Sequence, residues 1–280
     1  MVELWFHEKE TNELYIAHRI SRQLFHGQSP YQQVSILEGK EFGRMLVLDG
    51  IIQTTLRDEY IYHEMLAHVA LFTHRRPEKV LVIGGGDGGT VREVLKHPSV
   101  EQIHLVEIDE MVIDACRQHL PELASSFDDP RVSIHCTDGL KFVQDREGYY
   151  DVIIVDSSDP LGPAEGLFAY PFYKDCHRAL KDDGVFVAQT ESPFFTPELV
   201  GRIFGSLAAL YRHTYLFLAS VPTYSVAPWS FTIGSKAAHP LEPRGCPPED
   251  WQLRYYTEEI HRAAFALPAE VKKVLTIEDK

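Results

Sequence analysis

Apolar residues follow two different patterns along the chain. From Leu4 to about Thr55, short apolar runs alternate with polar residues and are separated by turn signals, among them Asp49-Gly50. Asp-Gly between two apolar runs is a strong signal for a β-hairpin. Residues 1–57 are therefore predicted to form a small antiparallel β domain. This segment is too small to bury much core of its own, which makes self-association plausible.

Residues 58–280 are predicted to form a second domain in which strands alternate with helices. A helix is expected to start at Asp58, a good N-cap, because apolar residues then recur at helical spacing until the chain approaches Pro77. The predicted strands are Lys79–Ile83, Gln102–Glu107, Arg131–Cys136, Asp151–Val155 and Val185–Gln189, with 215–220 and 229–235 completing an edge. Helices are expected near 90–97, 110–119, 139–146, 170–180 and 196–211. The alternation predicts an α/β fold, with a parallel sheet covered by helices on both faces.

The most informative segment is the glycine-rich loop that follows the first of these strands. Val80–Ile83 reads as a buried strand, and Gly84, Gly86 and Gly89 satisfy the pattern G-x-G-x-x-G, which alone is a weak signal. Such a loop lets backbone N–H groups and a helix N-terminus approach a nucleotide or nucleoside closely. Asp87 is unusual there, because its carboxylate would repel a phosphate and attract an amine. The loop therefore predicts a nucleoside ligand that carries positive charge.

Composition narrows the classes of partner. Asp plus Glu number 41 against 27 Lys plus Arg, a net charge of −14, which argues against a nucleic-acid binder. The charged N-terminus lacks the apolar region of a signal peptide, and no apolar stretch approaches the ~20 residues that span a bilayer. The four cysteines are scattered without a C-x-x-C pair, which favours buried free thiols in a reducing compartment. A cytoplasmic protein without a membrane partner is expected.

Acidic residues stand at the carboxyl ends of four predicted strands, where ligands bind in open parallel sheets. They are Asp87, Glu107, Asp109, Asp138, Asp156 and Asp159. Like charges brought together cost energy unless a cation or protons offset them, so this rim predicts a site for a polycation. Glu107 lies 23 residues after Gly84, a spacing that suits a carboxylate on ribose hydroxyls in both NAD and S-adenosylmethionine enzymes. Asp138-Gly139 is typical of an adenine contact.

Two other segments are candidates for chemistry. His63-Glu-Met-Leu-Ala-His68 resembles a zinc-binding motif but has one residue too many. Five positions turn about 140° around a helix, so the two histidines do not share a face and no metal is predicted. The loop Asp156–Gly166 is long and polar, and its glycines and Pro163 suit a hinged lid that excludes water.

Six separated blocks of sequence together resemble the spermidine synthase, or polyamine aminopropyltransferase, family. They are Leu48-Asp-Gly, Asp58-Glu-Tyr-Ile-Tyr-His-Glu-Met, Gly84-Gly-Gly-Asp-Gly-Gly, Val106-Glu-Ile-Asp109, Val155-Asp-Ser-Ser-Asp-Pro160 and Val221-Pro-Thr-Tyr224. The resemblance runs in order through nearly the whole chain. It implies an N-terminal β domain used in oligomerisation, as a homodimer or homotetramer, and a Rossmann-like domain of the methyltransferase type.

The resemblance also implies a reaction: transfer of an aminopropyl group from decarboxylated S-adenosylmethionine, a co-substrate and not a cofactor, to putrescine, which gives spermidine and methylthioadenosine. Carried over by position, the nucleoside would be held by Gln32, Glu107, Asp138, Gly139 and Pro163. The amine-bearing groups would be held by His63, Asp87, Asp156, Ser157, Ser158 and Asp159. Asp156 would be the catalytic base, and Tyr62 and Tyr224 would orient the attacking amine.

The sequence departs from the family at two places, and other functions stay open. Leu56 stands where relatives often have an acidic residue, and Ser225–Trp229 differs in the stretch that borders the acceptor pocket, so cadaverine or agmatine are alternatives to putrescine. A methyltransferase, a catalytically silent polyamine-binding protein and an NAD-dependent dehydrogenase are the alternative classes. Asp87 is the discriminating residue, because it would repel the carboxylate of ordinary S-adenosylmethionine.

Overall fold

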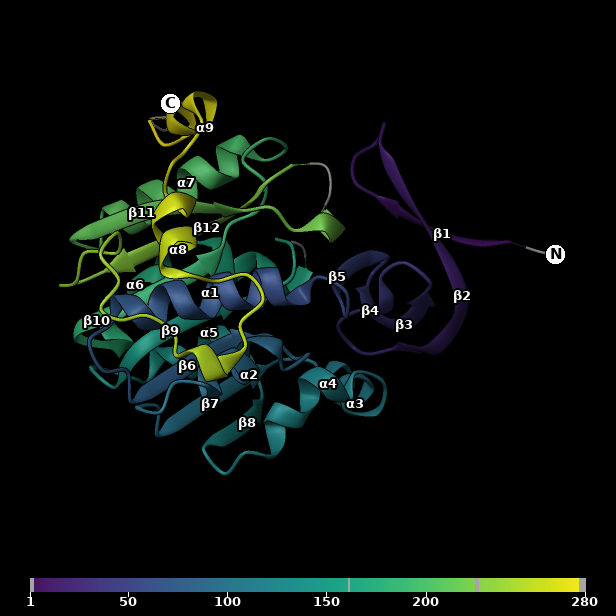
Figure 1. The fold of residues 1–280 in the computed structure, drawn as a ribbon, viewed down its shortest axis with the longest axis horizontal. Coiled ribbons are helices and arrows are strands. Elements are labelled where there is room, and N and C mark those ends of the chain that lie inside the picture. The colour runs from purple at the N-terminus through teal and green to yellow at the C-terminus, as the bar shows by residue number, and fades with distance from the viewer. Residues whose placement is uncertain (1–2, 161, 225–226, 277–280) are drawn as a thin grey trace.

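The computed structural model describes residues 3–160, 162–224 and 227–276, and within them the side chain of Pro163 is left undescribed. The chain begins with five antiparallel strands that pair in sequence order (Figure 1). They are β1 (Leu4–Lys9), β2 (Tyr15–Gln28), β3 (Gln33–Gly39), β4 (Gly43–Leu48) and β5 (Ile51–Thr55). The hairpin predicted at Asp49-Gly50 joins β4 to β5, and both turn residues have positive φ, as a two-residue hairpin loop of this kind requires. The antiparallel β region is confirmed.

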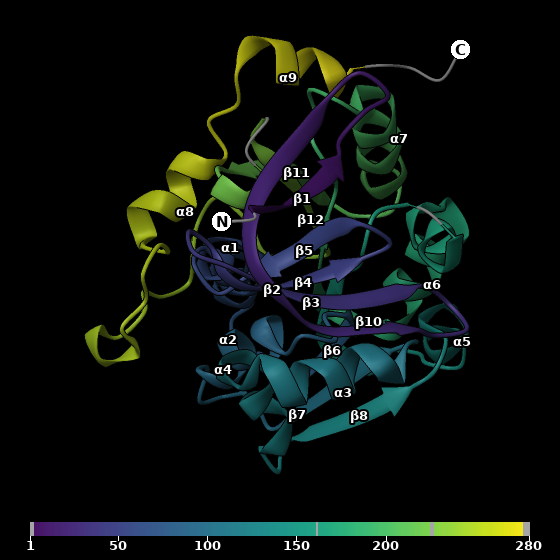
Figure 2. The ribbon, with the colours of Figure 1, turned by 90° about the vertical axis from the view of Figure 1, so that its right-hand side faces the viewer.

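This first sheet buries residues on both of its faces. On one face Val34, Ile36 and Leu46 join the main core of the molecule. On the other, Leu37 and Met45 belong to a small separate cluster. Because the first face packs against the rest of the chain, the β4–β5 hairpin is held over the end of the second sheet (Figure 2).

The second sheet has seven strands in the order β11-β12-β10-β9-β6-β7-β8. They are β6 (Lys79–Gly84), β7 (Gln102–Glu107), β8 (Val132–Cys136), β9 (Tyr150–Asp156), β10 (Leu180–Gln189), β11 (His213–Ala219) and β12 (Trp229–Ser235). The five strands from β8 to β10 are parallel, and β12 and β11 complete an antiparallel edge. Strand β10 starts at Leu180, earlier than the predicted Val185. Leu180 already pairs with Tyr150 of β9, and an irregularity in the pairing follows before the regular ladder resumes at Val185.

Helices cover both faces of this sheet, as predicted. The longer ones are α1 (Glu59–Thr73), α3 (Glu110–His119), α6 (Tyr170–Ala179) and α7 (Pro197–Ala208), and the shorter ones are α2 (Gly89–Leu95), α4 (Pro121–Ala124), α5 (Gly139–Gln144), α8 (Glu258–Ala264) and α9 (Ala269–Val274). Alternate residues of β6 enter opposite cores: Val80 and Val82 pack with α1, and Leu81 and Ile83 pack with α6. A strand buried on both faces explains its continuous apolar run.

Helix α1 starts where predicted, but Asp58 does not cap it with its side chain. The Asp58 carboxylate instead accepts hydrogen bonds from Thr55 Oγ1 at 2.6 Å and from the backbone N and Oγ1 of Thr223 at 2.6–2.7 Å. These bonds tie the end of β5 and the start of α1 to η3 (Pro222–Tyr224). The expected capping role was wrong because the carboxylate joins three segments that are distant in sequence.

Three other expectations concern the chain as a whole. All four cysteines are free, but Cys136 and Cys246 are exposed, so only Cys116 and Cys176 match the buried thiols that were predicted. Within residues 3–160, 162–224 and 227–276, every helix is too short or too polar to cross a lipid bilayer. The division of the chain at residue 57 stays a prediction.

Candidate active site

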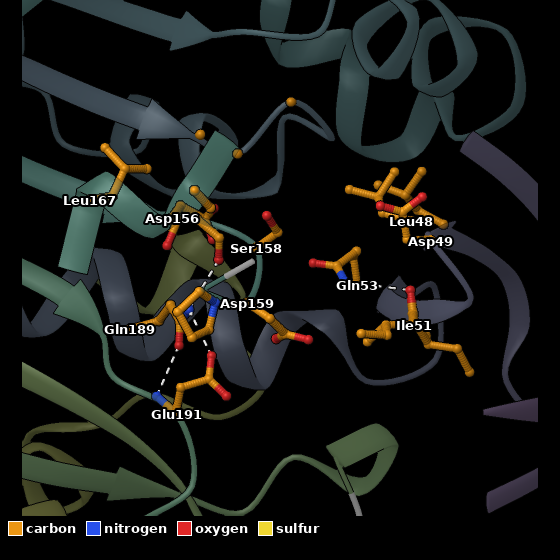
Figure 3. A pocket seen from close by; sticks show the side chains of 18 of the residues that line it. Leu48, Asp49, Ile51, Gln53, Asp156, Ser158, Asp159, Leu167, Gln189 and Glu191 are labelled. Atoms are coloured by element: carbon orange, nitrogen blue, oxygen red, sulfur yellow. Dashed lines mark hydrogen bonds between the residues drawn. The ribbon is translucent and has the colours of Figure 1, made fainter. Parts of the chain in front are cut away.

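A cavity of about 520 Å³ lies at the carboxyl ends of β6, β7 and β9. Residues of the β4–β5 hairpin form its opposite wall (Figure 3). The predicted site residues that line it are Gln32, Tyr62, His63, Asp87, Glu107, Asp138, Gly139, Asp156, Ser157, Ser158, Asp159 and Tyr224. The strand-end argument therefore brought residues from four separate segments into one place, and Gln32, Tyr62, His63 and Tyr224 were implied by the resemblance.

The glycine-rich loop is shaped by the carboxylate-bearing strand ends around it. Gly84 has a φ of +79°, and a Cβ there would lie 2.1 Å from the backbone oxygen of Asp156. The backbone N–H of Gly85 donates to that oxygen at 2.8 Å. A Cβ on Gly86 would lie 2.9 Å from Oε2 of Glu107. Glycine is thus needed for the loop to pack against β7 and β9, which brings their carboxylates to the same cavity.

Asp156, at the end of β9, has both carboxylate oxygens occupied. Tyr62 on α1 donates its hydroxyl to Oδ1 at 2.8 Å, and Thr90 on α2 donates Oγ1 to Oδ2 at 2.6 Å. Burial raises the pKa of Asp156, the neighbouring Asp87 carboxylate raises it further, and these two hydrogen bonds oppose the rise. Burial and the contact with Asp156 also raise the pKa of Tyr62 well above its ordinary value, so the phenol stays a donor. Thr90 was not predicted.

Asp87 and His63 form a buried pair beside Asp156. The backbone N–H of Gly89 donates to Asp87 Oδ1 at 2.6 Å, and His63 Nε2 lies 3.5 Å from Asp87 Oδ2. The other histidine of the zinc-like motif, His68, contacts different groups: its Nε2 lies 3.1 Å from a carboxylate oxygen of Glu93. The two histidines therefore face different partners, as the five-residue spacing predicted.

The second half of the cavity contains the residues predicted for the nucleoside. Burial raises the pKa of Glu107 to about 7, and its Oε1 accepts the backbone N–H of Asp109 at 3.0 Å. The Asp138 side chain caps α5 through the N–H of Leu140 at 2.9 Å, and Gly139 follows it in the wall. A Cβ on Gly139 would lie 2.6 Å from Ile83, so this wall also depends on the small residue.

Asp109 is the strand-end acid that does not reach the cavity. It is buried, and its Oδ2 accepts Ser29 Oγ at 2.7 Å and Gln32 Nε2 at 3.0 Å, while Oδ1 accepts the N–H of Met111 at the start of α3. Its inclusion in the acidic rim was wrong, because its hydrogen bonds join α3 to the β2–β3 turn. In that position it holds Gln32, which does line the cavity.

A group of carboxylates that sequence reasoning missed lies beyond Asp156. Glu191, just after β10, and Glu8 and Glu10, in and after β1, line the cavity together with Asp159. Burial, together with Glu8, raises the pKa of Asp159 to about 6. Burial, together with Asp159, raises the pKa of Glu191 to about 8. Glu191 could have been found by the strand-end rule, whereas Glu8 and Glu10 come from a sheet whose position the sequence does not indicate.

Pro163 and the stretch 225–229 are only partly described. Pro163 belongs to η2 (Gly162–Phe168), but its side chain lies outside the described residues. Tyr224 packs edge-on against Tyr62, with ring centroids 6.1 Å apart, and its hydroxyl donates to the backbone oxygen of Gln53. Residues 225 and 226, in the stretch that departs from the family, lie outside the described residues.

A sheet of mostly parallel strands with a carboxylate-lined cavity of about 520 Å³ at its strand ends is typical of Rossmann-like enzymes that bind a nucleoside-containing substrate. Two family descriptions match the chain: "Spermidine synthase tetramerisation domain" over residues 4–55 and "Spermine/spermidine synthase domain" over residues 59–242. The chain belongs to the spermidine synthase family and is a polyamine aminopropyltransferase, an enzyme of polyamine biosynthesis.

Relatives match along almost the full length. The chain is 49% identical to a polyamine aminopropyltransferase of Caldicellulosiruptor saccharolyticus over 98% of this chain and 99% of that one, and 51% identical to one of Moorella thermoacetica over 97% and 96%. A crystal structure of spermidine synthase with the transition-state analogue AdoDATO is 43% identical, with a TM-score of 0.95 over 98% of this chain and 95% of that one. Spermidine synthase from Thermotoga maritima superposes with a TM-score of 0.93 over 98% and 94%.

Proposed function

We propose that this aminopropyltransferase is a spermidine synthase, which transfers the aminopropyl group of decarboxylated S-adenosylmethionine to putrescine. The observation that carries the proposal is the gathering of Asp87, Asp156 and Asp159 in one cavity with Glu107. A donor with a sulfonium and an ammonium group, together with a diammonium acceptor, supplies the positive charge that such a cavity needs. The solved structure with a transition-state analogue supports these two substrates, since that enzyme is similar over nearly its whole length.

The nucleoside of the donor would lie at the β7 end of the cavity. Glu107 would accept hydrogen bonds from the ribose hydroxyls, and Asp138 and Gly139 would contact the adenine, with Gln32 and Pro163 completing this part. The aminopropyl ammonium would lie against Asp87. Ordinary S-adenosylmethionine carries an additional carboxylate at that end, and Asp87 would repel it, so one residue would separate this reaction from methyl transfer.

The chemical step requires a neutral amine. Putrescine's amines have a pKa near ~10, so both are ammonium at pH 7. Asp156 would accept a proton from one ammonium, and the freed lone pair would attack the donor carbon next to sulfur. As the new C–N bond forms, the C–S bond breaks and its electron pair goes to the sulfonium, which leaves as the neutral thioether methylthioadenosine. Tyr62 and Tyr224 would orient the nitrogen, and positioning would be the enzyme's main contribution.

The other end of the acceptor would stay positively charged. Asp159 and Glu191 would bind this second ammonium, and Ser157 and Ser158 would line the path between the two ends. This arrangement supports a diamine over a monoamine. Putrescine is proposed ahead of cadaverine and agmatine on the family resemblance alone. The choice between these acceptors would also depend on residues 225–229, the stretch that borders the acceptor pocket in the family.

An acceptor panel tests the proposal directly. Purified protein given decarboxylated S-adenosylmethionine should release methylthioadenosine fastest with putrescine, and Asp156→Asn should abolish release while its circular dichroism spectrum stays that of the parent. Calorimetry should show weaker binding of ordinary S-adenosylmethionine than of the decarboxylated form. Faster release with agmatine or cadaverine would reassign the acceptor, and unchanged turnover of Asp156→Asn would remove its role as base.

The enzyme is also proposed to be a homodimer or homotetramer assembled through its N-terminal strands. Leu4 and Trp5 on β1 and Tyr15 on β2 are about half exposed, so these large apolar side chains are available for contact with a second subunit. The match of residues 4–55 to a tetramerisation domain supports this assembly. Light scattering should give two or four times 31.9 kDa, and a monomeric mass would contradict the proposal.

A further inference from the structure

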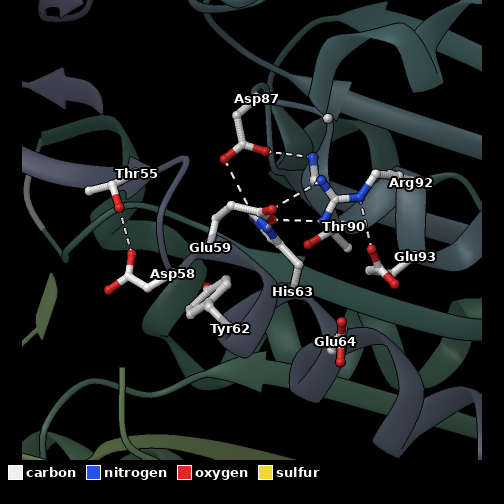
Figure 4. A network of polar contacts seen from close by, with 12 residues as sticks. Thr55, Asp58, Glu59, Tyr62, His63, Glu64, Asp87, Thr90, Arg92 and Glu93 are labelled. Atoms are coloured by element: carbon white, nitrogen blue, oxygen red, sulfur yellow. Dashed lines mark hydrogen bonds and ion pairs between the residues drawn. The ribbon is translucent and has the colours of Figure 1, made fainter. Parts of the chain in front are cut away.

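A chain of four charged side chains, three of them buried, leads to the cavity, and the mechanism above uses only its last member. It runs from Arg92 on α2 through Glu59 and His63 on α1 to Asp87 (Figure 4). Glu59, His63 and Asp87 are 6%, 2% and 7% exposed. Burying charges is costly unless each is paired. A chain of this kind therefore indicates that the carboxylate at its end, Asp87, has to be held in one position.

Glu59 is the best-held member of the chain. Arg92 donates from Nη1 to Glu59 Oε1 at 3.1 Å and from Nη2 to Oε2 at 2.7 Å, a two-pronged contact that fixes the plane of the carboxylate. The same Oε2 lies 2.7 Å from Nδ1 of His63, four residues further along the helix. Glu59 can only accept, so this contact requires a proton on Nδ1.

The other side of the imidazole is equally constrained. Asp87 Oδ2 lies 3.5 Å from Nε2, and a bare nitrogen lone pair facing a carboxylate would be repulsive, so Nε2 also carries a proton. His63 is therefore an imidazolium between two carboxylates. Burial opposes the charge, but Asp87 and Glu59 together raise the pKa of His63 well above its ordinary value. A Cβ on Gly89 would lie 2.2 Å from the ring, so a glycine at this position leaves room for the imidazolium.

We propose that Glu59 is a positioning residue: through His63 it fixes the orientation of the Asp87 carboxylate that receives the donor's ammonium group. This inference rests on the proposed function. Asp87 Oδ1 accepts the N–H of Gly89 at 2.6 Å and Oδ2 lies 3.5 Å from Nε2 of the imidazolium, so the hydrogen bond and the ion pair favour one orientation of the carboxylate. His63 then acts through Asp87, since both of its ring nitrogens are used within the protein.

Other charged and polar groups lie around the imidazolium and interact with its charge. Asp156 faces it from β9, and His63 opposes the rise in the pKa of Asp156 that burial causes. Tyr62 packs edge-on to the ring, and Arg92 approaches from α2 through Glu59. Loss of the imidazolium charge would therefore make Asp156 harder to deprotonate, so Glu59 influences both the donor subsite and the base.

The test is Glu59→Gln, with Glu93→Gln as a matched control. Glu93 is also buried and also accepts from Arg92, at 2.8 Å, but its other partners are His68 and Lys96. Glu59→Gln should raise KM for decarboxylated S-adenosylmethionine about ten-fold, the size of one charge-assisted hydrogen bond. It should also move the acid limb of kcat to higher pH. Glu93→Gln should lower stability but leave the donor KM and the position of that limb at the parent values.

The state of the ring is measured without turnover. In ¹⁵N NMR of histidine-labelled protein, with the signal assigned by its loss in His63→Gln, both ring nitrogens of the parent should be protonated at pH 8. A neutral ring in the parent overturns the inference even if no variant folds. A donor KM within two-fold of the parent in Glu59→Gln, or an equal effect of Glu93→Gln, also overturns it. A parent enzyme that releases no methylthioadenosine would instead defeat the proposed function.

Discussion

Replacement of Thr90 by valine tests how Asp156, the proposed base, is kept in its deprotonated form. The Thr90 hydroxyl donates to Asp156 Oδ2 at 2.6 Å, and valine keeps the shape of the side chain but removes the donor. A hydrogen bond to an ionised carboxylate is worth ~1.5–3 kcal/mol. One pKa unit corresponds to ~1.36 kcal/mol, so the pKa of Asp156 should rise by about 1–2 units. The deprotonated form, which would accept the proton from the amine in the proposed mechanism, then needs a higher pH.

Methylthioadenosine release measured against pH gives the readout. In Thr90→Val the acid limb of kcat/KM should move up by about 1–2 pH units, with rates about 10–100-fold lower on that limb and close to the parent above it. Thr73→Val is the control, because Thr73 on α1 is equally buried and its hydroxyl donates to the backbone oxygen of Val69 at 2.7 Å, outside the cavity lining. Superimposable profiles for the parent and Thr90→Val would refute the reasoning, as would an equal shift in Thr73→Val.

Other outcomes follow from the same cavity. Burial and Asp159 raise the pKa of Glu191 to about 8, and burial and Glu8 raise that of Asp159 to about 6, so both carboxyls gain negative charge as pH rises. KM for putrescine should therefore fall between pH 6 and 8, and Glu191→Gln should flatten this dependence; a pH-independent KM in the parent would contradict it. Burial raises the pKa of Glu107 to about 7, so calorimetry should show tighter methylthioadenosine binding at pH 8 than at pH 6. Gly89→Ala should lower both activity and the denaturant midpoint, because its Cβ would lie 2.2 Å from the buried imidazolium, whereas Gly205→Ala, with open space around the added Cβ, should stabilise α7 by about 0.5–1 kcal/mol.

Most of the fold was predictable because its signals are local. Each signal spans only a short stretch of sequence. This holds for the apolar runs of β6, β7 and β9, for the hairpin at Asp49-Gly50 and for the helical spacing of α1. Boundaries were wrong where pairing decided them, as at Leu180, which joins β10 through an irregular contact with β9. The capping role of Asp58 failed for a similar reason, since the partner it selects, Thr223, lies 165 residues away.

The site was predictable where one rule sufficed. Parallel strands end at the same edge of a sheet, so acidic side chains placed at the ends of β6, β7 and β9 are expected to lie close together. The exception is an acid whose carboxylate accepts hydrogen bonds that hold it away from the cavity. Asp109 is such an exception, because it accepts hydrogen bonds from Ser29 and Gln32. Thr90 could not be found, because a threonine inside a helix has no distinguishing pattern until the neighbouring strand places a carboxylate 2.6 Å from it.

The arrangement as a whole explains why a glycine-rich loop here belongs to an enzyme for cations. In a phosphate-binding loop, glycine brings backbone N–H groups close to an anion. In this chain a side chain on Gly84 or Gly86 would collide with β9 or with a β7 carboxylate, and one on Gly89 would collide with the ring of His63. These glycines therefore bring the protein's own charged groups together around the cavity. The N–H of Gly89, which could have bound a phosphate, donates to Asp87 instead, and the same backbone geometry presents a carboxylate where an anion would otherwise bind.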